Sequence, residues 1–179
     1  MREPTIARNY ADALFLVGER HGETERYAEV LTALAMVVET DDTVRVMLAS
    51  PRVSKPVKQR ILDGALRGLA PEPFRRFLGA VIKRGRQGLL PAIAGQYASL
   101  VDEKLHRIPV GVTLAREPDA SLRQLVQQRL TTLLAKEAIP AFRTDPAILG
   151  GMVVRVGDRI MDGSLRRRIV NLRRKMLNG

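Results

Sequence analysis

The chain has 179 residues, no cysteine and a formal net charge of +11, with 45% hydrophobic and 27% charged residues. This composition is typical of a folded globular protein and excludes wholesale disorder, and no apolar run reaches the roughly 18 residues that span a bilayer. Without cysteine there is neither a disulfide nor a thiolate for catalysis or metal binding. The absence of cysteine fits a reducing cytosol, and the first residues show no secretion signal.

Residues 1–106 are expected to form a bundle of six short helices. In six consecutive stretches the apolar residues recur at spacings of three and four, which is typical of one buried helix face. Glycine or proline interrupts the pattern near residues 22, 51, 71 and 85, where helices end or begin. In the fourth stretch Ser54 is the expected N-cap. The expected buried face of that helix consists of Val57, Ile61, Leu62 and Leu66.

From residue 107 the period changes, and a small mixed α/β module is expected over 107–179. Alternating apolar residues predict strands over 108–114, 139–143 and 152–156, and Gly157-Asp158 predicts a tight hairpin turn into a further strand. A helix is expected after Asp119, and another after Ser164. We therefore predict an α+β chain, with a helical domain over 1–106 and an α/β domain over 107–179.

The basic residues are concentrated in the second part. Residues 1–106 hold 16 Lys and Arg against 13 Asp and Glu, whereas residues 107–179 hold 14 against 6. The last helix combines arginines with an apolar face that we expect to be core, namely Leu165, Ile169, Leu172 and Met176. Arginines near a helix C-terminus also complement its dipole. A basic surface of this kind suits nucleic acid, anionic lipid or an acidic protein partner.

Four segments carry a resemblance to a known family. The most specific runs from Thr144 through Gly150-Gly151 and a valine-rich strand to Arg166. Near the start, Ala7, Arg8, Tyr10, Ala11, Ala13, Leu14 and Phe15 fit a second motif, and two shorter matches lie at Ser50 to Ser54 and from Gly85-Arg86 to Pro91. In order and spacing, the chain resembles the delta subunits of ATP synthases, which are related to the mitochondrial oligomycin sensitivity-conferring protein.

The resemblance implies a non-catalytic stator subunit of a rotary F-type ATP synthase. Such a subunit links the catalytic head to the b subunits of the peripheral stalk and resists rotor torque during proton-driven ATP synthesis. It implies no cofactor, no metal and no nucleic acid. The chain would then meet the membrane only through the complex, at the cytoplasmic face of a bacterial membrane.

The resemblance also implies two sets of contact residues. A groove between the first and fifth helices would receive the N-terminal segment of an alpha subunit, and the last helix would contact the stalk. Lys83-Arg84 replaces the acidic or amide residues usual in the family, which changes the charge at the end of that groove. The groove set is Tyr10, Ala13, Leu14, Val17, Phe77, Ala80, Val81 and Arg84. The stalk set is Arg166, Arg167, Arg173 and Arg174.

Two other functions fit parts of the sequence. The positive charge alone suggests a nucleic-acid-binding module, but residues 107–179 contain one aromatic residue, Phe142, so surfaces for base stacking are scarce. Asp145, Asp158 and Asp162 resemble a carboxylate cluster that could serve an enzyme. Each of them neighbours proline or glycine, so turn formation explains it more simply.

Overall fold

The computed structural model describes residues 3–177, which form eight α-helices and one four-stranded mixed sheet. The α+β class is therefore confirmed. The chain divides into two compact units, Met1–Val101 and Asp102–Gly179. This division lies in the last turn of helix α6 (Leu90–Lys104), slightly before the residue at which the periodicity changes.

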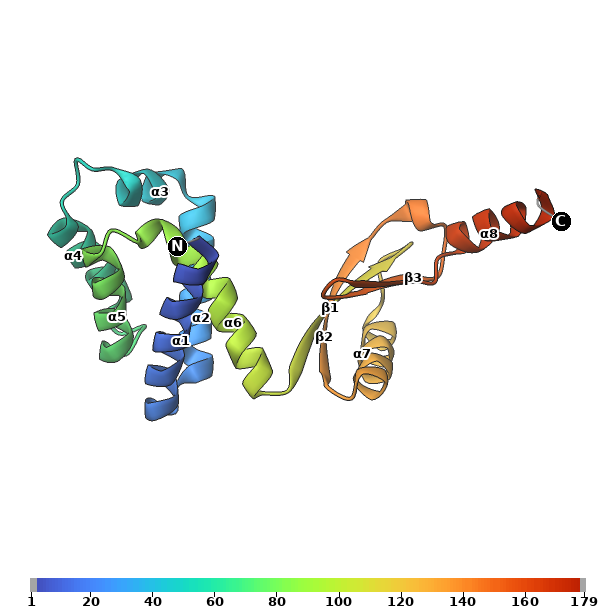
Figure 1. Cartoon of the computed structure of the whole chain (residues 1–179), viewed down its shortest axis with the longest axis horizontal. Helices are drawn as coiled ribbons and strands as arrows, with labels where there is room; N and C mark the ends of the chain where they lie inside the picture. Colours follow the sequence, from blue (N-terminus) through green and yellow to red (C-terminus); the bar gives the residue numbers. More distant parts are fainter. Residues whose placement is uncertain (1–2, 178–179) are drawn as a thin grey trace. The chain divides into compact units, whose positions relative to one another are not determined.

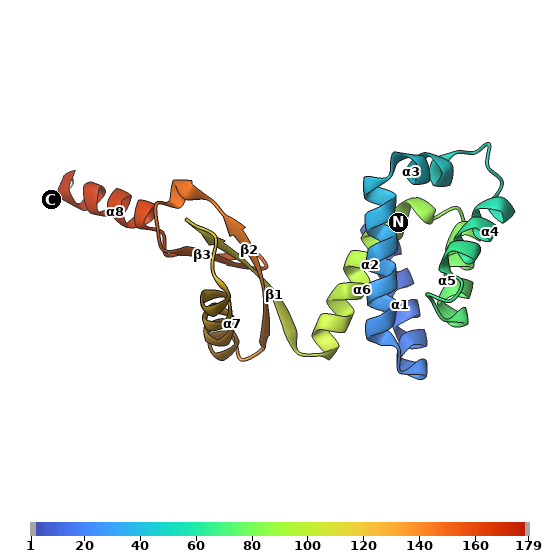
Figure 2. The same cartoon turned by 180° about the vertical axis from the view of Figure 1, so that it is seen from behind.

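Helices make up the first unit, drawn in blue to green in Figure 1. A short 3-10 helix, η1, precedes α6 and was not predicted, so a count of exactly six helices was incomplete for this unit. Helices α1, α2 and α6 lie side by side in both Figure 1 and Figure 2. The remaining bounds are α1 (Glu3–His21), α2 (Thr24–Thr40), α3 (Asp42–Ala49), α4 (Lys55–Leu66), α5 (Glu72–Lys83) and η1 (Gln87–Leu89).

Glycine, proline and capping residues set most helix ends, as the sequence predicts. After α1, Gly22 adopts a φ of +67°, which a residue without a Cβ tolerates best. At the start of α3, the Asp41 carboxylate accepts hydrogen bonds from the amides of Thr43 and Val44, at 2.8 and 3.2 Å. Ser54 does occupy the N-cap position of α4, but its side chain makes no capping hydrogen bond, so that part of the prediction was wrong.

Two tyrosines fill the centre of the first unit. The rings of Tyr27 and Phe74 lie 5.4 Å apart between centroids, and both side chains are completely buried. The Tyr97 hydroxyl donates to the carbonyl of Thr24 at 3.1 Å, and burial raises its pKa above the ordinary value for tyrosine. Gly18 leaves room for this ring, because a Cβ there would lie 2.8 Å from the Tyr97 hydroxyl.

The buried face of α4 differs from the prediction. Val57 and Ile61 are 41% and 45% exposed, whereas Lys58 is only 3% exposed. The Lys58 Nζ donates to the carbonyls of Leu48 and Ser50 at 2.6 and 2.8 Å, at the C-terminal end of α3. These carbonyls lie where a helix leaves its last acceptors without an internal partner. The lysine therefore joins α4 to the end of α3, which apolar periodicity alone does not reveal.

Replacing Lys58 by methionine is expected to destabilise the first unit by about 2 kcal/mol, because it removes a charged donor from two carbonyls. Lys55→Met is the matched control. Lys55, one turn earlier, donates to the carbonyl of Lys83 from an exposed position, so its loss should cost less than about 0.5 kcal/mol. Peptide-resolved hydrogen exchange of α3 and α4 would measure both changes. Similar protection in the two variants would contradict this role.

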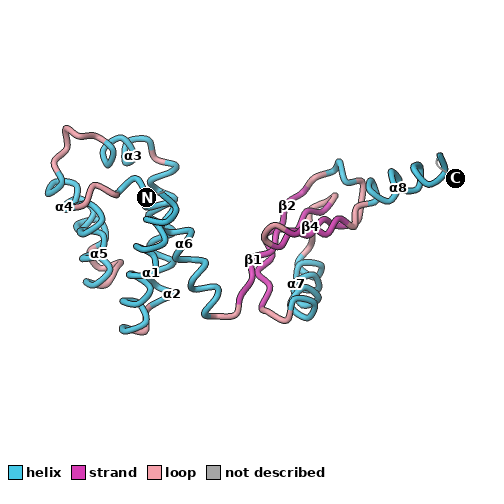
Figure 3. Tube along the Cα trace, viewed as in Figure 1, coloured by secondary structure: helices cyan, strands magenta, loops and turns pink. Residues whose placement is uncertain are grey.

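The second unit is a sheet with α7 packed on one face, and Figure 3 shows its strands in magenta. The strand order is β2-β1-β3-β4, with β1 and β2 parallel and the other pairs antiparallel. All the predicted strands and the hairpin are confirmed. The bounds are β1 (Arg107–Leu114), α7 (Ala120–Leu134), β2 (Glu137–Thr144), η2 (Pro146–Ile148), β3 (Met152–Val156), β4 (Arg159–Asp162) and α8 (Leu165–Leu177).

The glycines and aspartates of the 144–166 segment fix the start of α8. The amide of Gly163 donates to the carbonyl of Met152, and the amide of Leu165 donates to that of Gly150, both at 2.9 Å. Ser164 caps the helix, since its hydroxyl accepts from the amide of Arg167 at 3.2 Å. As predicted, these residues act in turns and in a cap. The segment holds the base of α8 against the end of β3.

Candidate functional site

An open groove lies between α1 and α5 of the first unit. The rings of Tyr10 and Phe77 meet edge to face, with centroids 6.2 Å apart, and so join the two helices. Beyond this contact the groove has a volume of about 500 Å³, with Glu72 and Arg76 forming an ion pair at its rim. Its lining consists of Ala13, Val17, His21, Glu72, Pro73, Arg76 and Phe77.

Of the eight residues predicted for this groove, Ala13, Val17 and Phe77 line it and Tyr10 lies beside them. Ala80 and Arg84 are exposed at and beyond the far end of α5, outside the lining residues. Leu14 and Val81 do not line the groove, because both are completely buried in the helical core.

The sequence reasoning missed His21, Glu72, Pro73 and Arg76 in this groove. Their positions at the end of α1 and the start of α5 carried a signal only once those two helices were known to be neighbours. Glu72 and Arg76 add a charged rim to this groove, and Pro73 adds to its apolar area.

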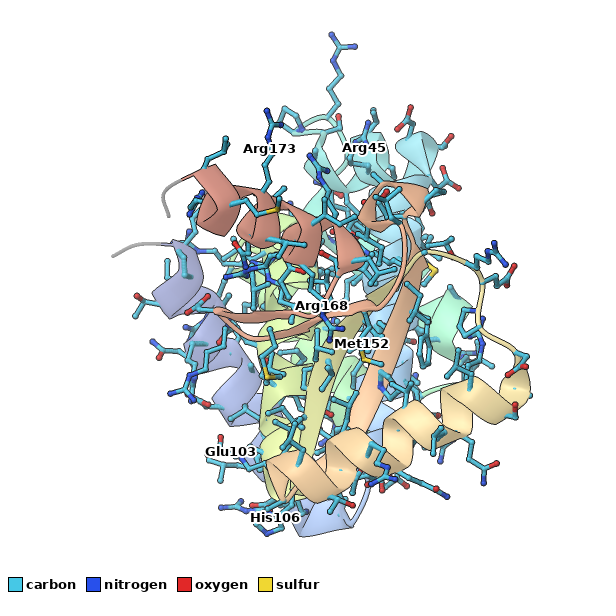
Figure 4. The ribbon with its side chains drawn as sticks, turned by 90° about the vertical axis from the view of Figure 1, so that its right-hand side faces the viewer. Arg45, Glu103, His106, Met152, Arg168 and Arg173 are labelled. Atoms are coloured by element: carbon cyan, nitrogen blue, oxygen red, sulfur yellow. The ribbon has the colours of Figure 1, made fainter. Side chains whose placement is uncertain are left out.

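A second groove, of about 730 Å³, lies between α7 and the β3–β4 hairpin. It exists because α7 packs mainly against β2, at one edge of the sheet, and leaves the side of β3 and β4 open. Val126 and Leu130 are buried against the sheet, whereas Leu125 and Leu133 are 51% and 68% exposed. Met152, labelled in Figure 4, belongs to the strand side of this groove. Such an exposed apolar surface is typical of a protein contact.

The apolar face of α8 is not core, contrary to the prediction. The exposed fractions of its four residues are 44% for Leu165, 57% for Ile169, 61% for Leu172 and 76% for Met176. No other element covers this face, because α8 contacts its own unit mainly at its base, through η2. The helix therefore carries an apolar face that lacks a cover within the described residues.

The four arginines predicted for the stalk contact are all on the exposed surface of α8. Arg167 forms an ion pair with Asp162 at 3.7 Å and also lines the groove beside α7. Arg166, Arg173 and Arg174 lie along the rest of the helix. Exposure makes these side chains available to a partner.

Asp162 gives the base of α8 a pH dependence. Hydrogen bonds from the hydroxyl and amide of Ser164 hold the pKa of this carboxyl below its ordinary value, with a smaller contribution from Arg167. A lowered pKa means that the ionised form stabilises the folded state. This stabilisation is complete above the ordinary pKa of about 4 and disappears as the pH falls through the lowered value.

We therefore expect the start of α8 to lose protection against hydrogen exchange as the pH falls below about 4. In Asp162→Asn the protection should be lower at neutral pH and should depend less on pH, because an amide cannot ionise. Exchange measured by mass spectrometry across this range, corrected for the intrinsic exchange rate, would test the expectation. The same pH profile in both proteins would contradict it.

The structure shows neither a metal cluster nor a membrane span among residues 3–177. No group of three or more His, Asp or Glu residues in this range could hold a metal ion. Asp145 and Asp162 accept hydrogen bonds from the amides of Ala147 and Ser164, and Asp158 lies in the turn between β3 and β4. In the same range no helix combines the length and hydropathy that crossing a bilayer requires.

Two units that each present an apolar groove, one of them with an exposed arginine-rich helix, define a protein-binding scaffold. Comparison with known proteins specifies the kind. The family model described as ATP synthase delta (OSCP) subunit matches residues 6–176, so the chain belongs to this family. It is a non-catalytic connector subunit of the stator of an ATP synthase, and nothing in this match supports a nucleic-acid-binding module.

Individual relatives match along almost the full chain. ATP synthase subunit delta of Gemmatimonas aurantiaca is 40% identical over 172 residues, which cover 96% of this chain and 93% of the relative. Subunit delta of an Anaeromyxobacter species is 36% identical over 175 residues, covering 96% and 97%. A chain in the mitochondrial ATP synthase hexamer of Toxoplasma gondii has the same fold, with a TM-score of 0.72, 18% identity and coverage of 96% and 97%.

Proposed function

We propose that the first unit binds the N-terminal segment of an alpha subunit and that the second unit binds the b-type subunits of the peripheral stalk. The chain would thus join the catalytic head to the stalk and hold the head against rotor torque. This connection requires stable binding at both ends and no bond chemistry in the chain itself. Family membership together with the open α1/α5 groove carries the proposal.

The α1/α5 groove has the properties of a helix-binding surface. Val17, Pro73 and Phe77 supply apolar contact area, and the small side chain of Ala13 permits the close approach of another backbone. Glu72 and Arg76 place one charge of each sign at the rim. An amphipathic segment could bury its apolar face here and direct its polar face to the rim, as in other helix-in-groove complexes.

For the second unit, charge and exposure support the stalk contact. Residues 107–179 carry 14 basic against 6 acidic residues, and the arginines of α8 are exposed. Such a surface favours association with an acidic partner and speeds its approach at low salt. The groove beside α7 offers further apolar area on the same unit. The chain would be peripheral to the membrane, held at its cytoplasmic face through the complex.

A pull-down tests both ends of this connection. The full chain, immobilised through a tag, is incubated with detergent-solubilised membranes of the source cells, and the bound proteins are identified by mass spectrometry. Recovery of alpha and b subunits together is the expected result. Recovery of alpha without b, from membranes whose complex has been dissociated by salt and then returned to low salt, would refute the stalk contact while leaving the contact with the head intact.

A further inference from the structure

The exposed face of α8 follows the spacing of a coiled-coil seam. Leu165, Ile169, Leu172 and Met176 succeed one another at intervals of four, three and four residues, which is the alternation of d and a positions in a heptad. At about 100° per residue these four side chains form one narrow stripe along the helix. All four are at least 44% exposed, so the seam is formed and no helix among residues 3–177 covers it.

Arginines flank this stripe on both sides. With Leu165 and Leu172 at d, Arg166 and Arg173 occupy e positions and Arg168 occupies a g position. These positions choose the partner of a coiled coil through charge. Figure 4 labels Arg168 and Arg173 on different sides of α8, as the heptad requires. By contrast, Arg167 and Arg174 fall at f positions on the far side of the helix.

The flanking charge excludes a second copy of the chain as the occupant. In a parallel pair of α8 helices Arg168 would face Arg173 of the second copy. In an antiparallel pair the arginines at e positions would face one another, and so would those at g positions. Either arrangement sets like charges against each other, which destabilises the pair.

The helix cannot easily cover its own face either. Hydrogen bonds at Gly163, Ser164 and Leu165 hold its base. The neighbouring groove is itself apolar, and its charged lining residues are Arg129, Asp162 and Arg167. Its one carboxylate, Asp162, already pairs with Arg167, on the side of α8 away from the stripe.

We infer that the occupant of this seam is an amphipathic helix with apolar a and d residues and with glutamate or aspartate at its own e and g positions. This inference rests on the proposed function, because it specifies the stalk segment that the second unit would bind. It also changes the residues expected at the contact. Arg166, Arg168 and Arg173 should lie at the seam, whereas Arg167 and Arg174 should not.

The seam is short, and this sets the expected strength of binding. Helix α8 has 13 residues, which is fewer than two complete heptads. Helical pairs of this length are marginal in isolation. The contact should therefore be weak without help from other surfaces and should weaken further as salt screens the arginines.

Adjacent arginines supply a matched test in the full-length chain. Arg173→Glu reverses a charge at the seam, whereas Arg174→Glu makes the same change one residue away on the far side. The probe is the soluble C-terminal segment of the cognate b subunit, labelled for fluorescence anisotropy. We expect Arg173→Glu to weaken binding about three- to tenfold and Arg174→Glu by less than about twofold. Ile169→Ser, at an a position, should weaken binding by roughly tenfold.

The outcomes separate the inference from the proposed function. Binding of the b segment with equal affinity to all the variants would overturn the inference and leave the stalk contact in place elsewhere on the unit. Equal weakening by Arg173→Glu and Arg174→Glu would also overturn it, since it would indicate attraction without a seam. If wild-type chain does not bind the b segment, the stalk proposal fails.

In that case a synthetic peptide, with leucine at a and d and glutamate at e and g, tests the seam by itself. If Arg173→Glu and Ile169→Ser weaken the binding of this peptide more than Arg174→Glu does, the result would support the inference independently of the stalk. Tighter binding to phosphatidylglycerol vesicles than to the peptide would overturn it in favour of a membrane surface.

Discussion

Gly151→Ala is expected to destabilise the second unit by about 3 kcal/mol. Gly151 has a φ of +75°, and alanine in this left-handed region costs about 1–2 kcal/mol. In addition, a Cβ at this position would lie 2.4 Å from the carbonyl oxygen of Gly163. This oxygen belongs to the backbone at the base of α8, so it cannot swing away as a side chain would. Relieving the overlap adds about 1–3 kcal/mol.

Gly157→Ala is the matched control. Gly157, in the hairpin turn, also has a positive φ, of +56°, but no atom lies within 4 Å of a Cβ built there. It shares the backbone strain of Gly151 without the collision, and about 1 kcal/mol is expected. Peptide-resolved hydrogen exchange of β3 and β4 would compare the variants without interference from the first unit. Equal losses would mean that Gly151 is required only for its φ.

Ala13→Asp is expected to weaken the binding of an alpha-subunit N-terminal peptide at least tenfold, which corresponds to about 1.4 kcal/mol or more. The new carboxylate would stand in the apolar groove between α1 and α5, and the bound peptide would desolvate it without supplying a partner. The variant should still fold, because Ala13 is exposed. The affinity of a labelled peptide for the full chain, measured by anisotropy, gives the result.

The matched control for this substitution is Ala33→Asp, which puts the same side chain on an exposed position of α2, away from the groove. Both variants pay the same small helix-propensity penalty. Circular dichroism would establish that both remain folded. If the two variants bind the peptide as tightly as the wild-type chain does, the alpha segment must bind somewhere other than the α1/α5 groove.

These two experiments address different uses of small residues. At Gly151 the missing side chain lets two backbone segments touch, and so fixes where α8 begins. At Ala13 the small side chain leaves open surface, which a partner can enter. In the sequence both positions stood in family motifs and could have had either role. The close approach of the Gly163 carbonyl shows that Gly151 serves a contact between two backbone segments, whereas Ala13 is exposed and lines the groove.

Several site predictions depended on the fold in the same way. The stripe of α1 contains Tyr10, Ala13, Leu14 and Val17, and its periodicity places all four on one face. Only the packing of the neighbouring helices, α2 and α5, against α1 separates Leu14, which is completely buried, from Ala13, which is exposed. In α4 the same reasoning chose Val57 and Ile61, and the position of α3 instead buries Lys58.

The sequence by itself determined the class of the fold, the positions of the strands and most helix ends, because these depend on local periodicity and on glycine, proline and capping residues. It also determined the family. The tertiary structure decided which apolar residues are covered, because burial depends on a neighbouring element that local spacing does not specify. The last helix shows this most clearly. Its apolar stripe reads as core in the sequence, yet nothing in residues 3–177 packs over it, which is why we look for its partner in another chain.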